Sequence, residues 1–375
     1  MDLKLPNTFK KPNDNEAEIT LIGTGGYGEA VLIHLGSNNW IIVDSCVNPN
    51  TKTPLTIEYL NQIGVDCSKE VKLLICTHWH DDHISGISKA LDTCKNAKFV
   101  FSKAHDRNKF LRFIAFDYKK RIIESSNSST LEFNKCIEII ESRGDTILAA
   151  YSDRVLYANN LSTDLACQVV ALSPSDFTME KFDQEISTLI TEFGSPSKKI
   201  PFNKPNAKSV ALFIKMGVHR AILGADLEVS DDVREGWVNI INNSQVLDKK
   251  ASLFKIPHHG SENGYHKDIW SNLLNENPVA KLTPYNKGKG LPDAKMLNKY
   301  SQHTDSLYMT APFVNNNPKH RDKQINKYLT QIGKKLQEVK FKKGIIQSRI
   351  KIDDPRDTWK TMMIENSFHV NSSVR

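Results

Sequence analysis

Three histidines and two aspartates are packed into residues 77–83, which read Thr-His-Trp-His-Asp-Asp-His. The segment directly follows the apolar run at residues 71–76, which is typical of a buried strand. On an extended backbone His78 and His80 alternate, so both rings can point to one side. Histidines placed so close together repel one another when protonated, and a divalent metal is the usual partner that keeps them neutral. The spacing therefore predicts a metal site at the end of a strand, in preference to a solvated surface cluster.

The segment offers enough donors for two ions, namely His78, His80, Asp82 and His83. Imidazole nitrogen and carboxylate oxygen at about 2.0–2.2 Å suit zinc, and an ion with an open position can hold a water molecule for catalysis. We therefore expect two divalent metal ions, with zinc as the first choice and manganese as the second.

The pattern His78-x-His80-x-Asp82-His83 resembles the signature of the metallo-β-lactamase fold superfamily. Three other stretches stand in the order that this family shows: an apolar strand before Asp44, a strand at 220–226 that ends in Asp226, and a strand at 253–261 that carries His258 and His259. Four ordered matches over roughly residues 17–262 are far more than chance similarity would give.

The resemblance implies an α/β fold, the four-layer αββα sandwich, and a site divided between two ions. His78 and His80 would hold the first ion, while Asp82, His83 and one of His258 or His259 would hold the second. Asp226 would bridge the two ions, and Asp82 would be indispensable for catalysis. We favour His259 as the ligand. His258 would then be a general acid or substrate hydrogen-bond donor, or simply a structural histidine behind the ligands.

Many members of this superfamily carry a third histidine for the first ion, and this chain has no clear equivalent. His219 falls in the turn before the strand at 220–226, at the opposite end from Asp226, and is a poor candidate. His105, just past a short predicted strand, is a slightly better one. More consistent with the resemblance is a first ion completed by water, substrate or Asn206, with weaker binding that would allow manganese.

A narrower likeness comes from residues 206–212 together with Pro257-His258-His259-Gly260-Ser261. These stretches, and Leu172-Ser173-Pro174 before them, are similar to the hydrolase domain of the ComEC/Rec2 DNA-uptake proteins and their soluble relatives. Those membrane proteins carry long apolar spans, whereas the longest apolar runs here are far below the roughly 18 residues that a span needs. The likeness is therefore to the hydrolase domain only, and it implies a phosphodiester substrate and no membrane insertion.

The glycine-rich segment at residues 23–28 also matches the fingerprint of dinucleotide-binding proteins. That fingerprint requires a helix after its last glycine, so that the helix N-terminus can meet the pyrophosphate. The residues that follow, 29–35, form a β-like apolar stretch instead. We therefore interpret the glycines as a hairpin turn near the site, and His34 as a strand residue that binds no metal.

Composition and patterning suggest one large domain with additions. The 375 residues are 39% hydrophobic and 25% charged, which is ordinary for a globular protein. We expect a hydrolase domain at residues 1–315, with a helical insertion at about 104–143, and a basic extension at 316–375. The six cysteines show no C-x-x-C spacing, and the start of the chain has no signal-peptide pattern, so we expect reduced thiols and a cytoplasmic protein.

The formal net charge is +7, and residues 319–351 alone contribute +9, from eleven lysines and arginines against two acidic residues. A basic extension behind a hydrolase domain suggests an anionic substrate or partner such as nucleic acid. The alternative is that these lysines form the solvated face of a packed helix, because Tyr328, Leu329, Ile332, Leu336 and Val339 have helical spacing. The sequence favours neither, and it identifies no protein partner.

Three functions are compatible with these features. The favoured one is a metal-dependent phosphodiesterase or nuclease, in which a metal-bridging hydroxide attacks phosphorus. The second is a hydrolase of a small lactone, lactam or thioester, with a narrow pocket closed by the insertion at 104–143. The third is a metal-bound but non-catalytic module of a multi-protein system, which the intact Asp82 disfavours.

Overall fold

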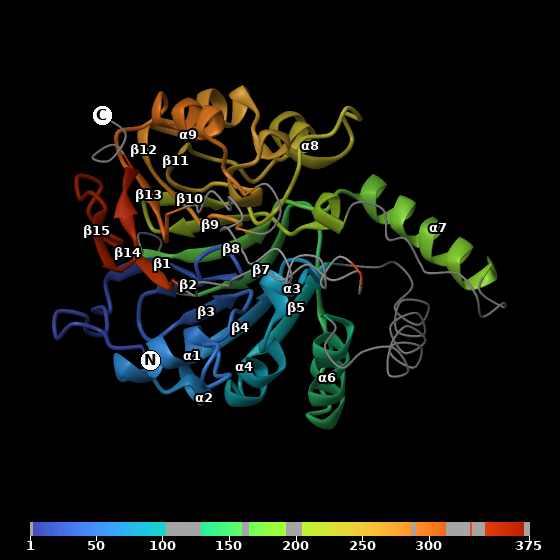
Figure 1. Cartoon of the computed structure of the whole chain (residues 1–375), viewed down its shortest axis with the longest axis horizontal. Coiled ribbons are helices and arrows are strands. Elements are labelled where there is room, and N and C mark those ends of the chain that lie inside the picture. Colours follow the sequence, from blue (N-terminus) through green and yellow to red (C-terminus); the bar gives the residue numbers. More distant parts are fainter. Residues whose placement is uncertain are drawn as a thin grey trace.

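Two sheets of eight strands each lie face to face, with helices against both outer faces (Figure 1). The computed structural model describes residues 3–102, 129–159, 165–192, 205–286, 290–312, 331 and 342–370. Within these residues the layers run helix, sheet, sheet, helix. The predicted four-layer αββα sandwich is therefore confirmed.

The first sheet is antiparallel on one side and parallel on the other. Its parallel part runs from β3 through β4 and β5 to β6, and β1 pairs antiparallel with β2 and with β14. In spatial order its strands are β15 (Lys360–Glu365), β14 (Gly344–Lys351), β1 (Glu16–Gly23), β2 (Glu29–Leu35), β3 (Trp40–Val43), β4 (Val71–Cys76), β5 (Lys98–Ser102) and β6 (Leu148–Ala150).

The second sheet has the same mixed character. Strands β10 to β13 are parallel to one another, while β7, β8 and β9 form an antiparallel meander beside β10. In spatial order its strands are β16 (Phe368–His369), β13 (Leu307–Met309), β12 (Leu274–Leu282), β11 (Ala251–Lys255), β10 (His219–Leu223), β9 (Leu212–Met216), β8 (Cys167–Ala171) and β7 (Arg154–Ala158).

Helices cover the two outer faces unequally. Four lie on the first sheet: α1 (Leu55–Gln62), α2 (Cys67–Glu70), α4 (Ile87–Thr93) and α6 (Ser129–Ser142). The second sheet is covered by α8 (Gly236–Asn243) and α9 (Ala294–Ser301), while α7 (Asp176–Glu192) projects away from the body and α3 (Asp81–Ile84) is a single turn at the strand ends. Short 3-10 or π turns occur at Pro205–Lys208, His258–Gly260, Glu262–Gly264 and Ile269–Leu273.

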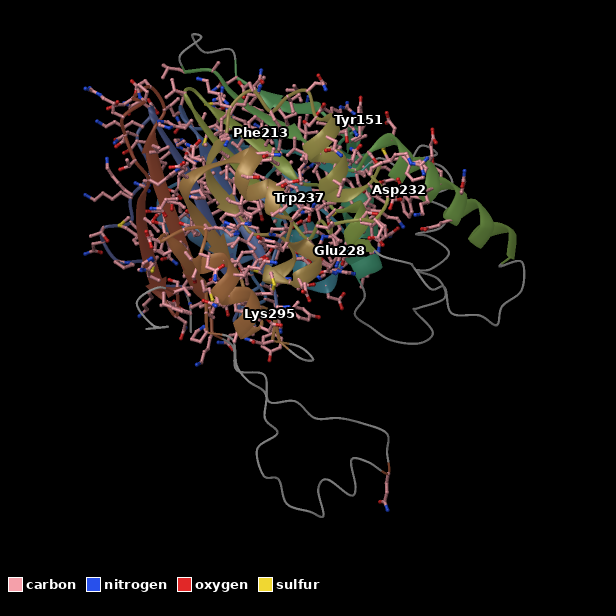
Figure 2. All side chains as sticks on the ribbon, turned by 90° about the horizontal axis from the view of Figure 1, so that it is seen from above. Tyr151, Phe213, Glu228, Asp232, Trp237 and Lys295 are labelled. Atoms are coloured by element: carbon pink, nitrogen blue, oxygen red, sulfur yellow. The ribbon has the colours of Figure 1, made fainter. Side chains whose placement is uncertain are left out.

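Three apolar clusters hold the layers together. One fills the space between the sheets with side chains such as Leu21 and Ile214. The other two lie under the helices, and Trp237 of α8 lies over the middle of the second sheet when the molecule is seen from above (Figure 2). Because the sheets are covered on both faces, β2 reads as a continuous apolar run and not as an alternating one.

The glycine-rich segment at residues 23–28 is a hairpin loop. β1 and β2 pair antiparallel from Ala17 opposite Leu35 to Gly23 opposite Glu29, so the strand expected after the glycines is present. Gly26 has a φ of 89° and lies so close to Asn286 that a Cβ there would meet its backbone nitrogen at 2.6 Å. The rejection of a dinucleotide fingerprint is therefore supported by the backbone itself.

The structure describes only parts of the predicted insertion at 104–143 and of the predicted extension at 316–375. Within the predicted helical insertion at 104–143, the structure describes the helix α6, which buries Phe133 and Ile140 against the first sheet. Residues 103–128 lie outside the described residues, as do all lysines and arginines between 313 and 341. Residues 344–351, assigned on sequence to one extension, form β14 and pair with β1 along its whole length, so they are internal to the sheet. No described helix is long and apolar enough to cross a membrane.

Two buried lysines sit side by side on the inner face of the second sheet, in register on β11 and β12. Lys255 and Lys281 are 2% and 0% exposed. Lys281 donates to the carbonyls of Ile19, at 2.7 Å, and Ile346, at 3.1 Å, across the sandwich. Burial without a bonded carboxylate holds its pKa well below the usual value, although Glu18 opposes this shift. Lys281 therefore joins the two sheets through hydrogen bonds to backbone carbonyls, and burial disfavours its charged form.

The buried His34 on β2 should make stability depend on pH. Its Nδ1–H donates to the Glu16 carbonyl at 2.9 Å, its Nε2 has no hydrogen-bond partner, and burial lowers its pKa from 6.5 to about 3. Below pH 6.5 His34 therefore binds a proton in the unfolded chain but stays neutral in the folded protein until the pH approaches 3. We expect this residue to remove roughly 2 kcal/mol of stability between pH 6.5 and 4.5.

The measurement is urea unfolding of the wild type and His34→Gln at both pH values. The glutamine amide can still donate to Glu16, so the variant should lose less stability between the two pH values than the wild type does. Equal losses in the two proteins would show that His34 does not titrate as described.

Candidate metal centre

The predicted site residues gather where parallel strands end. Asp44 follows β3, and the histidine-rich segment follows β4. On the second sheet Asp226 follows β10, and His259 follows β11. Because β3 and β4 are parallel, as are β10 and β11, their carboxyl ends lie at one edge of each sheet, and the sandwich brings the two edges together.

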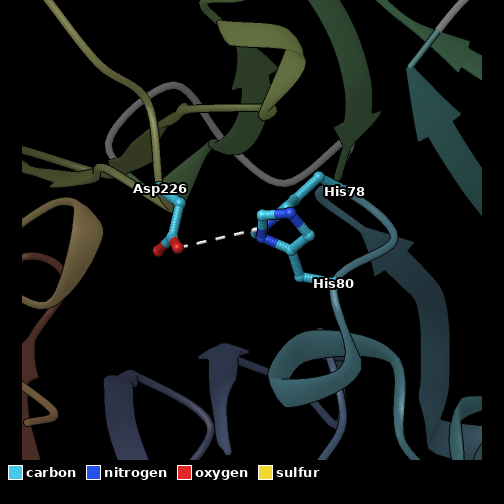
Figure 3. Close-up of side chains that lie close together, drawn as sticks. All are labelled: His78, His80 and Asp226. Atoms are coloured by element: carbon cyan, nitrogen blue, oxygen red, sulfur yellow. Dashed lines mark hydrogen bonds and ion pairs between the residues drawn. The ribbon is translucent and has the colours of Figure 1, made fainter. Parts of the chain in front are cut away.

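The first group of possible ligands consists of His78, His80 and Asp226. His78 Nε2 lies 3.1 Å from His80 Nδ1 and 3.8 Å from Asp226 Oδ2. Figure 3 shows the aspartate approaching from the second sheet while both imidazoles approach from the first. One donor atom from each residue lies within 4.8 Å of the other two, which is close enough to share an ion.

The second group consists of Asp82, His83 and His259. His259 Nε2 lies 3.1 Å from Asp82 Oδ2, and His83 Nε2 lies 3.8 Å from the same oxygen. Asp226 also reaches this group, with Oδ1 at 3.3 Å from His83 Nε2 and Oδ2 at 3.6 Å from His259 Nε2. Asp226 therefore stands between the two groups, where one carboxylate can serve two ions.

Two atoms at the centre of the site have no hydrogen-bond partner. His83 Nε2 and the facing Asp226 Oδ1 are both buried and unsatisfied, although each is a strong metal ligand. Leaving buried polar atoms unpaired costs about 1–3 kcal/mol each. A divalent cation would satisfy both atoms at once, so the donors present fit the metal ions that the sequence predicts.

The ligands are fixed from behind by hydrogen bonds. His83 Nδ1 donates to Asp44 Oδ2 at 2.8 Å, and Asp44 also accepts from the backbone nitrogen and hydroxyl of Thr77, at 2.8 and 2.7 Å. His259 Nδ1 donates to the carbonyl of Thr283 at 3.0 Å. Each bond leaves Nε2 of its histidine directed toward the cluster, as metal ligation requires.

The pKa values of His78 and His83 are shifted in opposite directions. Burial, together with the neighbouring charge of His83, holds the pKa of His78 well below its usual value. Burial also acts on His83, but the carboxylates of Asp226, Asp44 and Asp82 outweigh it and hold the pKa of His83 well above the usual value. The carboxylates around His83 therefore favour positive charge at this position, which a bound divalent ion would supply.

Backbone strain is concentrated at the same strand ends. Asp44, Ala225, His258 and His259 all have left-handed φ values, of 60°, 45°, 47° and 51°. Such conformations cost non-glycine residues on the order of 1–3 kcal/mol each. They turn the chain sharply after β3, β10 and β11, so that the side chains face one another across the gap between the sheets.

His258 and His259 point to different surroundings. His259 enters the second ligand group, as favoured from the sequence, whereas His258 Nε2 accepts from the Asn206 amide at 3.0 Å. His258 Nδ1 donates to Asn263 Oδ1 at 2.9 Å and lies 3.4 Å from Glu228 Oε1. Glu228 lies on the side from which α7 projects (Figure 2). A role for His258 in catalysis stays a prediction.

The three candidates for completing the first ion are His219, His105 and Asn206. His219 lies at the start of β10, where its Nε2 contacts the Asp354 carbonyl at 2.9 Å, and it is absent from the ligand groups of the described residues. His105 lies outside the described residues. Asn206 is 8% exposed, its amide nitrogen also donates to Glu228 at 3.1 Å, and its Oδ1 is unsatisfied.

Sequence reasoning missed three residues next to the ligands. Glu29 was interpreted only as the first residue of the β-like stretch after the glycine-rich segment. In the structure it forms a third potential ligand group with His83 and Asp226. Lys255 is buried and ion-paired with Glu29. Tyr285 lies with its ring 5.2 Å from that of His259. Glu29 and Lys255 are charged residues in otherwise apolar strands, and this pattern could have identified them. No comparable sequence pattern marks Tyr285.

Comparisons with known proteins agree with the fold. Residues 23–118, about a quarter of the chain, match the family model described as "Metallo-beta-lactamase superfamily". This match includes Asp44 and the whole histidine-rich segment. No curated protein matches the sequence.

The matching solved structures resemble this chain only loosely. The metallo-beta-lactamase fold protein YhfI from Bacillus subtilis is 13% identical, with 64% of this chain and 70% of that chain covered and a TM-score of 0.33. The hydrolase AbOPH of the beta lactamase superfamily is 12% identical, with 58% and 73% covered and a TM-score of 0.33. A metallo beta lactamase from Hirschia baltica is 12% identical, with 58% and 70% covered and a TM-score of 0.25. At these TM-scores the likeness carries no conclusion about chemistry.

Asp226 should control the uptake of both ions, because it contacts both ligand groups. We expect Asp226→Asn, which keeps the shape and removes the charge, to weaken zinc or manganese binding at least about tenfold at each group. Calorimetric titration of metal-free protein and elemental analysis measure this. Asp232→Asn, on the surface near α7, is the matched control and should bind like the wild type. Unchanged stoichiometry and affinity in Asp226→Asn would refute the bridging position.

Proposed function

We propose that the protein is a metal-dependent hydrolase of the metallo-β-lactamase superfamily that uses two divalent ions. The observation that carries this proposal is the position of Asp226, whose two oxygens face His83 of one ligand group and His78 of the other. A single structural ion would not need a carboxylate shared between two sets of buried donors.

The ions would contribute Lewis acidity and a water molecule whose pKa is lowered toward neutrality. The chain itself supplies the geometry. His78 and His80 with Asp226 would hold the first ion, and Asp82, His83 and His259 the second. Asp44 and the Thr283 carbonyl keep His83 and His259 in the orientation that leaves Nε2 free for an ion. We propose zinc as the resident metal, with manganese as the alternative.

For the substrate class we propose a phosphodiester, and the basic segment at residues 319–351 leads us to propose a nucleic acid as its source. The buried carboxylates at the site are Glu29, Asp44, Asp82 and Asp226, and Lys255 is the buried cation beside them, so their formal charge is −3. Two divalent ions would change it to +1, or to zero with a bridging hydroxide, so the loaded site would no longer repel an anionic substrate. The likeness to ComEC/Rec2 hydrolase domains supports the same choice.

We also propose a cellular location and a partner. All six cysteines are buried and free, in keeping with a reducing compartment, and we propose the cytoplasm. The proposed partner is an anionic polymer that contacts the basic segment.

Asp82 provides the direct test of the activity, because its carboxylate is predicted to hold the second ion. We expect the zinc- or manganese-loaded wild type to hydrolyse a bis-aryl phosphate, DNA or RNA. Asp82→Ala should lower turnover by at least about 100-fold while the circular dichroism spectrum stays unchanged. Asp232→Asn again serves as the control for a surface carboxylate. Full activity in Asp82→Ala would remove the two-metal proposal.

The choice of substrate is tested by the same preparations. If a lactone, lactam or thioester is hydrolysed and no phosphodiester is, the small-molecule alternative replaces the phosphodiesterase. If ions bind and nothing in either class is hydrolysed, the non-catalytic alternative gains instead.

A further inference from the structure

A buried ion pair lies directly behind the second ligand group. Lys255 on β11 and Glu29 at the start of β2 are each 2% exposed, and Lys255 Nζ contacts Glu29 Oε1. Lys255 Nζ also donates to the carbonyl of Ala225 at 3.0 Å. The pair therefore joins the two sheets at the edge where the ligands are gathered.

Glu29 faces the rear nitrogens of two ligand histidines. Its Oε1 lies 3.8 Å from His83 Nδ1, and its Oε2 lies 3.8 Å from His259 Nδ1. A carboxylate in this position favours a proton on Nδ1 and makes Nε2 the better electron donor toward a metal. Glu29 Oε2 has no hydrogen-bond partner among the described residues, where Lys255 and these imidazoles are its ionisable neighbours.

Lys255 also contacts the backbone directly before Asp226, the carboxylate shared by both ligand groups. Its acceptor Ala225 has a left-handed φ of 45° and immediately precedes Asp226. Holding the Ala225 carbonyl fixes the sharp turn that aims the Asp226 carboxylate at the cluster. One ammonium group therefore contacts both the backbone before the bridging aspartate and the carboxylate behind the two histidines.

Comparison with the neighbouring lysine shows that this charge is not a general need of the fold. Lys281 occupies the paired position on β12, bonds only to backbone carbonyls, and has a pKa well below the usual value because of burial. Burial opposes charge on Lys255 as well, but Glu29 and Asp226 outweigh it and raise the pKa of Lys255. Of these two buried lysines, Lys255 contacts a carboxylate, Glu29, whereas Lys281 bonds to backbone carbonyls.

We propose that Lys255 and Glu29 are a positioning pair for the second metal ion. Glu29 could itself join a ligand group with His83 and Asp226, but its contact with Lys255 holds it behind the Nδ1 atoms of His83 and His259, where it helps to orient these two histidines. The inference rests on the metal-binding part of the proposed function and is independent of the substrate. Loss of such supporting contacts typically weakens metal binding by 10- to 100-fold while the ligands themselves remain.

The experiment compares the neutral double variant Glu29→Gln/Lys255→Met with the wild type. Removing both charges together avoids leaving one buried ion unpaired, which would by itself unfold the protein. Zinc and manganese are titrated into metal-free protein, and cobalt spectra report ligand geometry. His80→Ala is introduced into both proteins to disable the first group, so that the ion at Asp82, His83 and His259 is measured alone. Lys281→Met is the matched control, a buried lysine on the neighbouring strand.

We expect the double variant to unfold at a temperature close to that of the wild type, to bind the second ion 10- to 100-fold more weakly, and to show an altered cobalt spectrum. Lys281→Met should bind both ions normally. Wild-type affinity for the second ion in the double variant would overturn the proposal. Equal weakening of both ions when the first group is intact would also overturn it, because that result indicates general damage to the site. A protein that hydrolyses no substrate would leave these binding results unaffected.

Discussion

The site depends on like charges being forced together between two sheets. Buried carboxylates at the strand ends would repel one another without compensating positive charge; they raise the pKa of His83 and of Lys255, which favours the charged forms of both. Among the described residues His83 Nε2, Asp226 Oδ1 and Glu29 Oε2 still have no hydrogen-bond partner. The fold therefore holds its most costly contacts at the place where divalent cations would relieve them.

Rigidity at this place comes from two sources. Hydrogen bonds from Thr77 and His83 to Asp44 fix the first-sheet side of the site, and left-handed turns at Ala225, His258 and His259 fix the other. The sandwich stabilises these conformations because its inner face is packed with apolar side chains on both sheets. Strain at the strand ends is thus balanced by burial along the strands.

Much of this arrangement could be predicted from the chain. The αββα sandwich was implied by the family resemblance that the histidine-rich segment and the ordered strand ends carry, and the two stacked sheets confirm it. The glycine-rich hairpin was separable from a nucleotide loop by the β-like residues after it. The strand at 344–351 was missed because it was assigned, with the basic segment before it, to one extension, although Gly344–Lys351 lies beside β1.

The sequence by itself determined the types and the local spacing of the candidate ligands, since His78, His80, Asp82 and His83 lie within six residues. Only the tertiary structure separated His258 from His259, because these adjacent residues in left-handed conformations point to different neighbours. It alone brought Glu29 and Lys255 together from strands more than 200 residues apart. Contacts across the sandwich depend on how the two sheets stack, and the pattern along a single strand does not encode that stacking.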